Sequence, residues 1–136
     1  GDWSTYEFVR RLVFSVLIGN ADMHLKNWSV LYPDGRAPVL SPAYDFVSTL
    51  PYIPGDRLAL SFGASRGLDG ITLDTVRRFA DTARLPMKPL WDIVCETAER
   101  TAQAWKALDQ KGLLPAEILK AIDGQIQRAA AGTGRA

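Results

Sequence analysis

Residues 17–45 read LIGNADMHLKNWSVLYPDGRAPVLSPAYD, and the predicted architecture rests on the change from helix to hairpin within this stretch. The helix is predicted to begin at Ser4, an N-cap hydroxyl with the carboxylate of Glu7 three residues later, as in a capping box. Apolar residues recur behind this cap at helical spacing as far as Ile18. Gly19 adopts left-handed dihedrals easily and is therefore predicted to end the helix.

A β-hairpin is predicted after a polar loop that covers residues 21–27. Residues 28–32 and 37–40 form two short runs of β-branched, aromatic or apolar residues, as strands do. Residues 33–36, Pro-Asp-Gly-Arg, combine a proline that presets φ with a glycine that accepts positive φ. Pro38 favours a second strand that is short or lies at an edge.

The remainder of the chain is predicted to be helical after a long loop. Residues 44–70 are rich in Gly, Pro, Ser and Asp and lack periodicity, which is typical of a functional loop region. Three helices are expected behind it, from a Thr72 cap to about residue 83, from Pro89 to Gly112, and from Pro115 onward, with residues 131–136 frayed. An apolar stripe is expected on the second of these helices, formed by Leu90, Ile93, Val94, Ala98, Ala102, Trp105 and Leu108. The predicted fold class is mostly α, of the α+β kind.

Composition restricts the class of protein further. The length of 136 residues predicts one domain, 1–136, and 16 basic against 15 acidic residues exclude a strongly basic binder of polyanions. Cys95 is the only cysteine, which fits a reducing cytoplasm, and its apolar neighbours predict a buried thiol. The most apolar run, residues 12–18, is far shorter than the ~20 residues of a membrane span, and no signal peptide is visible. We therefore expect a cytoplasmic globular chain outside any membrane.

Polar side chains gather at the two ends of the predicted hairpin. Asn27 precedes the first strand and Asp45 follows the second, so that strands ~4.8 Å apart should make them neighbours. Two oxygen ligands suit Mg²⁺, which binds one or two carboxylates together with phosphate and water oxygens. Asp22, on the same loop as Asn27, is placed to accept the proton of a hydroxyl nucleophile. Phosphoryl transfer requires this division of roles, because it depends on charge neutralisation and alignment.

The spacing Asp-x-x-x-x-Asn, followed by a hairpin and another Asp, is also the layout of a protein-kinase catalytic loop and its metal-binding aspartate. Other roles for these residues stay open on this evidence. Asp22 also fits a loop residue that binds backbone amides, and Lys26 also fits a solvated charge. His24, the only histidine, fits either a contact with phosphate or a hydrogen-bonded orienting role.

These residues also carry a family resemblance. Residues 17–30, LIGNADMHLKNWSV, and residues 41–49, SPAYDFVST, resemble the C-terminal lobe of HipA-type toxin kinases, and residues 58–63 with the later helices fit the same region. The resemblance implies a protein-kinase-like C-terminal lobe of a serine/threonine kinase from a type II toxin–antitoxin pair, which uses ATP and Mg²⁺. It implies a protein substrate, in known members an aminoacyl-tRNA synthetase. It also implies an antitoxin of the HipB type, through which DNA is contacted only indirectly.

The resemblance assigns roles by position. Asp22 matches the catalytic aspartate, and Asn27 and Asp45 match the Mg²⁺ ligands. Two loop residues match positions beside the nucleotide phosphates and a tyrosine matches the nucleotide floor, so that the implied nucleotide-binding set is His24, Lys26, Asn27, Tyr44 and Asp45.

The chain departs from the family in what it lacks. Kinases of this family are much longer, and the sequence contains neither a glycine-rich phosphate loop nor the strand lysine that pairs with the α- and β-phosphates. Residues 63–67 contain glycine but follow Asp45, so they do not match that loop. We therefore expect that an N-terminal lobe is missing and that this lobe alone is inactive. The alternatives are an aminoglycoside-type phosphotransferase lobe, a non-catalytic interaction module and, last, a metal-dependent hydrolase that uses Asp22, His24 and Asp45.

Overall fold

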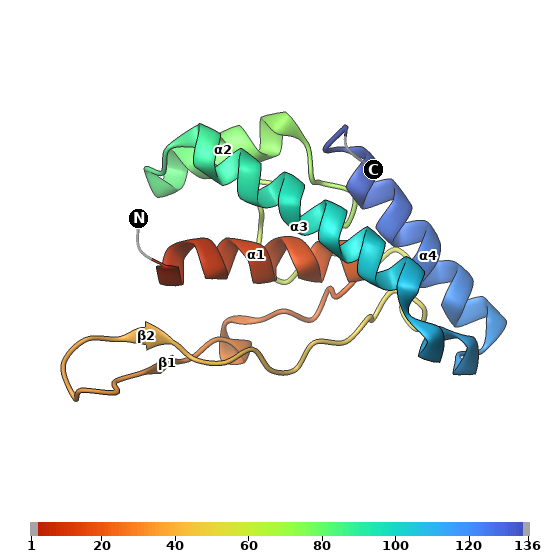
Figure 1. Ribbon diagram of the computed structural model, residues 1–136. Coiled ribbons are helices and arrows are strands. Elements are labelled where there is room, and N and C mark those ends of the chain that lie inside the picture. Colours follow the sequence, from red (N-terminus) through yellow and green to blue (C-terminus); the bar gives the residue numbers. More distant parts are fainter. Residues whose placement is uncertain (1–2, 135–136) are drawn as a thin grey trace.

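The computed structural model describes residues 3–134 and shows a mostly helical domain with one small hairpin. The elements, in chain order, are α1 (Trp3–Ile18), η1 (Leu25–Asn27), β1 (Val30–Leu31), β2 (Val39–Leu40), α2 (Leu73–Ala83), α3 (Met87–Ala107), η2 (Asp109–Leu113) and α4 (Ala116–Ala131). Helix α1 lies in the middle, with α2 and α3 on one side and the hairpin on the other (Figure 1). Helix α4 packs against α1 and α3. The α+β prediction is confirmed.

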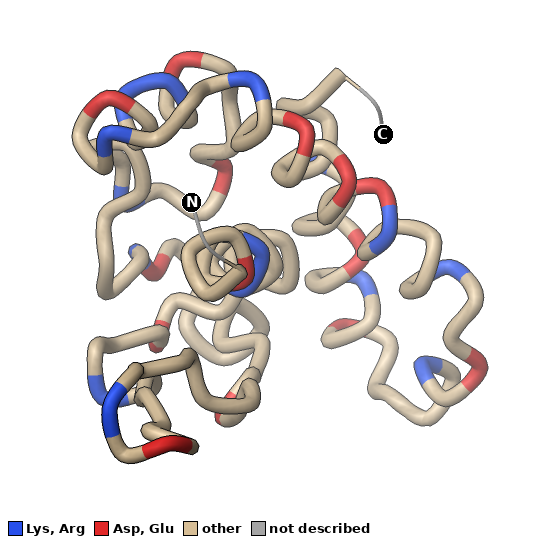
Figure 2. The backbone as a smooth tube through the Cα atoms, turned by 60° about the vertical axis from the view of Figure 1, so that its left-hand side comes forward, with Lys and Arg blue, Asp and Glu red and all other residues tan. Residues whose placement is uncertain are grey.

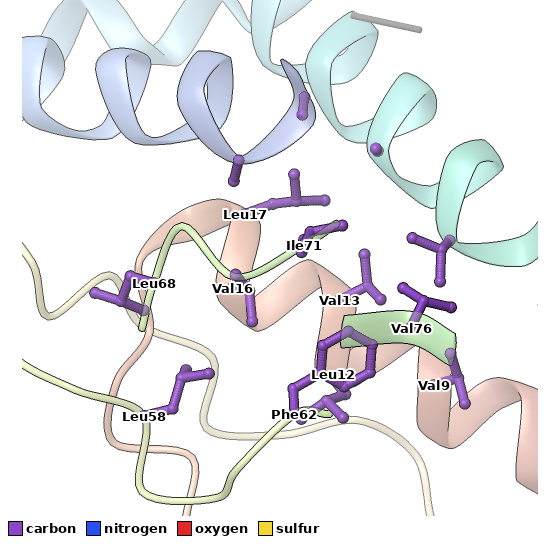
Figure 3. Close-up of a cluster of buried hydrophobic side chains, with 14 of the residues drawn as sticks. Val9, Leu12, Val13, Val16, Leu17, Leu58, Phe62, Leu68, Ile71 and Val76 are labelled. Atoms are coloured by element: carbon purple, nitrogen blue, oxygen red, sulfur yellow. The ribbon is translucent and has the colours of Figure 1, made fainter. Parts of the chain in front are cut away.

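The core forms around one face of α1. Its buried apolar residues follow the three- and four-residue spacing of a helix and are Val9, Leu12, Val13, Val16 and Leu17. Figure 3 shows them facing Leu58, Phe62, Leu68 and Ile71 from the long loop and Val76 from α2. The loop therefore contributes to the core, and its position is fixed against α1. At the tight turn after Phe62, Gly63 has φ +55°, and a Cβ there would lie 1.9 Å from the Thr75 carbonyl oxygen.

The hairpin is present as predicted, with shorter strands. Val30 pairs with Leu40 and Leu31 with Val39 in an antiparallel register. In the turn, the carboxylate of Asp34 accepts hydrogen bonds from the backbone N–H groups of Arg36, at 2.9 Å, and Ala37, at 2.8 Å. These two bonds, the one from Ala37 first, lower the pKa of Asp34, because they favour the charged carboxylate.

Helix starts were predicted with mixed success. The Thr72 cap of α2 is confirmed, since the Thr72 hydroxyl accepts from the Thr75 N–H at 3.2 Å. The Ser4 cap is wrong: α1 already includes Trp3, and the Ser4 hydroxyl instead accepts the Leu40 N–H at 3.2 Å. A hydrogen bond to the hairpin thus replaces the local cap.

The boundaries of α3 and the end of the chain also differ from the prediction. Helix α3 begins at Met87, and Pro89 occupies its third position, where the helix needs no N–H donor. It ends at Ala107, not at Gly112, and residues 109–113 form η2 instead. Leu108, which was predicted to belong to the apolar stripe, lies outside α3 and is 41% exposed. The predicted frayed tail is wrong as far as Thr133, which is buried and whose hydroxyl donates to the Ala130 carbonyl at 2.7 Å. Residues 135–136 lie outside the described part.

Charges of both signs are interspersed along the chain (Figure 2), in keeping with a net charge of +1. The basic residues from the middle of α2 to the start of α3 are exposed, and they are Arg77, Arg78, Arg84 and Lys88. Among residues 3–134, no helix combines the length and apolar character needed to cross a bilayer.

A substitution in the α1 face tests the core. Leu17 is fully buried, and we expect Leu17→Ala to lower the free energy of unfolding by about 2–5 kcal/mol, through lost transfer energy and the cavity left behind. Urea denaturation followed by circular dichroism measures this change. The matched control is Leu113→Ala, because Leu113 is 86% exposed. Equal effects of the two substitutions would contradict the packing described here.

Candidate functional site

The two ends of the hairpin hold the central pair of the site. Asn27 closes η1 just before β1, and Asp45 follows β2 with a left-handed φ of 58°. The Asn27 side-chain amide, through Nδ2, donates a hydrogen bond to Asp45 Oδ2. Below them the Ser41 N–H donates to the Ser29 carbonyl at 2.9 Å, so the backbone pairing continues beyond the strands. The expectation that Asn27 and Asp45 are neighbours is confirmed.

Tyr44 and Lys26 lie beside this pair. The Tyr44 hydroxyl donates to the backbone carbonyl of Lys26 at 3.2 Å, and both side chains are exposed. Within residues 3–134, the Lys26 ammonium takes part in no hydrogen bond or ion pair that would fix it. Tyr44 therefore fastens the loop to the segment after β2, and the Lys26 charge is left to face solvent or an anion.

Asp22 lies earlier on the loop that leads to Asn27, and its side chain is half-exposed. Its Oδ1 is 3.0 Å from His24 Nε2, and the side chains are 53% and 52% exposed. Its N–H donates to Oδ1 of the buried Asn20 at 3.2 Å, which fixes the backbone. The loop then curls, because the Asn27 N–H donates to the His24 carbonyl at 3.0 Å. In the described chain the Asp22 carboxylate pairs with His24 and makes no hydrogen bond to Asn27 or Asp45.

The possible metal ligands are the neutral amide oxygen of Asn27 and the charged carboxylate of Asp45. The Asp45 carboxylate is exposed, while Asn27 Oδ1 is buried and accepts no hydrogen bond within residues 3–134. Asn27 Nδ2 faces Asp45 in the present arrangement. Rotation of the amide by 180° about its terminal bond would exchange the positions of the two atoms and bring Oδ1 toward Asp45. No group of three His, Cys, Asp or Glu side chains suited to a metal exists among the described residues. This donor set fits Mg²⁺ completed by phosphate oxygens and does not fit structural zinc.

Arg11, on α1, also contacts the segments that carry the site, and it was not identified from the sequence. Its side chain is 10% exposed, and its Nη1 donates to the Ser41 carbonyl at 2.7 Å while Nε pairs with Glu7 at 2.9 Å. Together with Asn27 and Asp45 it lines a small cavity. The one available signal was a basic residue next to the buried Leu12 on an apolar helix.

Aromatic contacts anchor both flanks of the pair to α1. The Trp28 ring, directly after Asn27, lies 4.3 Å from the Phe8 ring between centroids. The Phe46 ring, directly after Asp45, lies 5.4 Å from the Phe14 ring. Both contacts reach the same helix, so α1 serves as the common support for the two ligand-bearing segments.

Comparison with known proteins assigns the family. The sequence matches the family model described as HipA-like C-terminal domain over residues 3–105. The chain belongs to the HipA-like C-terminal domain family. The recognition made from residues 17–30 and 41–49 is therefore confirmed.

Two relatives of this chain are much longer than the chain itself. It is 48% identical over 118 residues to a protein of Sinorhizobium fredii named "Putative kinase Y4dM", covering 86% of this chain and 29% of that protein. It is 34% identical over 96 residues to "Putative kinase Y4mE" of the same organism, covering 67% of this chain and 23% of the relative. The chain thus spans less than a third of the length of each of these two relatives.

A solved structure shares the fold. It is described as the HipA, HipB and operator DNA complex of the toxin–antitoxin system of Shewanella oneidensis MR-1, and the match has a TM-score of 0.73 at 24% identity. The match covers 96% of this chain and 31% of that one. The predicted fold, a mostly helical lobe of the HipA kind with a small hairpin, is confirmed.

Proposed function

We propose that this chain is the C-terminal catalytic lobe of a HipA-like serine/threonine protein kinase, which transfers the γ-phosphate of ATP to a protein hydroxyl. The observation that carries the proposal is the Asn27–Asp45 pair, joined across the hairpin ends within one short loop of the half-exposed Asp22. Family membership and the kinase names of the relatives support it.

The proposed step is an in-line displacement at phosphorus. The oxygen of the acceptor hydroxyl forms a bond to the γ-phosphorus, the bond from that phosphorus to the β–γ bridging oxygen breaks, and ADP leaves. Asp22 orients the hydroxyl and takes its proton. In this proposal His24 would orient the carboxylate of Asp22, and the 3.0 Å contact between Asp22 Oδ1 and His24 Nε2 supports that role.

The ligand pair and the loop lysine have electrostatic roles in this proposal. Asn27 and Asp45 would hold Mg²⁺, which supplies charge neutralisation on the phosphates when bound. Lys26, whose ammonium is exposed, would contact a phosphate oxygen. Tyr44, fixed to the loop through the Lys26 carbonyl, would border the nucleotide.

We further propose that the rest of the kinase, including an N-terminal lobe with the phosphate loop, covers the hairpin. Exposed apolar side chains gather on the hairpin and at the start of α1 beside it. They are Trp3, Val30, Leu31, Tyr32 and Val39. A run of exposed apolar residues of this kind indicates an interaction surface. The further partners that we propose are an antitoxin of the HipB type, an acceptor such as an aminoacyl-tRNA synthetase, and DNA reached only through the antitoxin.

Comparison of the isolated chain with the complete kinase tests the proposal. We expect the 136-residue chain to show no ATP-dependent phosphorylation, because it lacks the phosphate loop, and the complete protein to phosphorylate serine or threonine of an added protein. Transfer of radiolabelled phosphate measures both. Transfer only to a small hydroxyl compound would favour the aminoglycoside-type alternative, and ester hydrolysis by the isolated chain would favour a hydrolase.

A further inference from the structure

A group of hydrogen bonds joins the segment after Asp45 to the start of the Asp22 loop; we name it the Gly19–Thr49 contact. The Gly19 carbonyl accepts from the backbone N–H groups of Thr49, at 3.0 Å, and Leu50, at 3.1 Å. It also accepts from the Thr49 hydroxyl at 3.2 Å. The same hydroxyl accepts from the N–H of Ala21 at 3.0 Å. The contact therefore ends one residue before Asp22 on one segment and begins four residues after Asp45 on the other.

A side-chain hydroxyl is the group that suits this place. It donates to one backbone group and accepts from another at the same time, which an apolar side chain of equal size cannot do. Ala21 is buried, and its carbonyl is already bound by the Ala59 N–H at 3.0 Å. Without the hydroxyl, the Ala21 N–H would be buried and unpaired, a state that folded proteins avoid.

The two segments are packed closely at Gly19, so that even one added methyl group would not fit between them. Gly19 has φ +72°, and a Cβ at this position would lie 2.9 Å from Leu50 Cβ. The same Cβ would lie 3.4 Å from Gln125 Cγ, and Gln125, from α4, donates to the Val16 carbonyl at 2.9 Å and so holds the end of α1. Because the end of α1 is fixed, the hydrogen bonds of the Thr49 hydroxyl set where the Asp45 segment lies relative to the start of the Asp22 loop.

We infer that Thr49 is a positioning residue, which sets the placement of the Asp22 loop relative to the Asp45 segment and so the alignment of the acceptor hydroxyl with the metal-bound phosphate. The inference rests on the proposed function. The hydroxyl of Thr49 bonds to Ala21 and Gly19 and to none of the proposed site residues, so that Thr49 acts through Ala21 and Gly19. A misplacement of about 1 Å between reacting groups lowers rates by about 100-fold, so the effect of its loss should appear in kcat.

The test uses the complete kinase with Thr49→Val and Thr49→Ser. Valine keeps the shape and removes both hydrogen bonds of the hydroxyl, so we expect kcat to fall by about 10- to 100-fold with the KM for Mg²⁺-ATP changed by less than about threefold. Serine restores the hydroxyl and should return kcat to near the wild-type value. The matched control is Thr97→Val, which removes a hydroxyl that donates to the Ile93 carbonyl within α3 at 2.7 Å, and it should leave kcat unchanged.

Several results would overturn the inference. A folded Thr49→Val protein with wild-type kcat would do so, as would equal losses in Thr49→Val and Thr97→Val. Failure of Thr49→Ser to restore kcat would assign the role to the methyl group instead. If Thr49→Val does not fold, Thr49→Cys, a weaker hydrogen-bonding group of similar size, is measured in the same way.

A second readout separates this inference from the proposed function. Amide hydrogen exchange of Ala21 should accelerate at least tenfold in Thr49→Val and not in Thr97→Val, whether or not the protein transfers phosphate. Unchanged protection of Ala21 would show that the hydroxyl does not hold the loop. Faster Ala21 exchange in Thr49→Val, found together with a wild-type protein that transfers no phosphate at all, would leave the contact in place and refute the kinase assignment.

Discussion

We expect the replacement of Asp22 by asparagine to lower the phosphorylation rate of the complete kinase by about 10²- to 10⁴-fold, the usual contribution of a positioned base in proton transfer. Asparagine keeps the size of the side chain and an oxygen for the 3.0 Å contact with His24, while it loses the ability to take a proton. Nucleotide binding should change little, because Asp22 makes no hydrogen bond to Asn27 or Asp45 in the described chain. Steady-state transfer assays and calorimetric titration with Mg²⁺-ATP measure the two effects separately.

Asp81→Asn is the matched control for this experiment. Asp81 is an exposed aspartate on α2 that does not line the cavity at Asn27 and Asp45, and its replacement removes the same charge. Near-normal turnover of the Asp22→Asn protein would remove Asp22 from the role of base. Equal losses in both variants would instead indicate a general effect of charge.

Replacing Asp45 by asparagine should remove most of the Mg²⁺-dependent part of nucleotide affinity and lower turnover by at least about 10³-fold, since electrostatic stabilisation is the largest single contribution to such reactions. Asparagine is the suitable replacement here, because Asp45 has a φ of 58° and asparagine tolerates this left-handed conformation. Alanine would add backbone strain to the loss of the ligand. The asparagine variant therefore reports on the carboxylate charge alone.

The metal itself provides the control for Asp45. In EDTA, wild type and Asp45→Asn should bind ATP with equal affinity, and only added Mg²⁺ should separate them. If the affinity for Mg²⁺-ATP and the turnover are unchanged in the variant, Asp45 holds no metal. That result would favour the non-catalytic interaction module among the alternatives.

The placement of the ligand pair could be predicted because it depends on local structure. A Pro-Asp-Gly-Arg turn between two apolar runs requires a hairpin, and a hairpin brings its flanking residues together wherever the rest of the chain lies. Asn27 and Asp45 are therefore neighbours for reasons contained in residues 27–45. The Thr72 cap is of the same kind, because its partner Thr75 is three residues away.

The supports of the site could not be predicted in this way. Arg11 binds the Ser41 carbonyl 30 residues along the chain, and Thr49 binds Ala21 across 28 residues. Nothing in the neighbouring residues of Arg11 or Thr49 specifies these partners. The wrong assignment of Ser4 has the same cause, since its hydroxyl serves Leu40, 36 residues away, and not the helix that contains it.

The order of the elements, the hairpin, the proximity of Asn27 and Asp45 and the family could all be predicted from the amino-acid sequence. The first three follow from dihedral preferences, hydrophobic periodicity and motif spacing, which act between residues close together in the chain, and the family was indicated by the resemblance of residues 17–30 and 41–49. The way in which α1 supports both site segments became visible in the folded chain, through Arg11, the Phe8–Trp28 contact and the Gly19–Thr49 contact. Hydrogen bonds and ring contacts between distant segments exist only once the core around α1 has packed, because packing alone sets which groups lie within bonding distance.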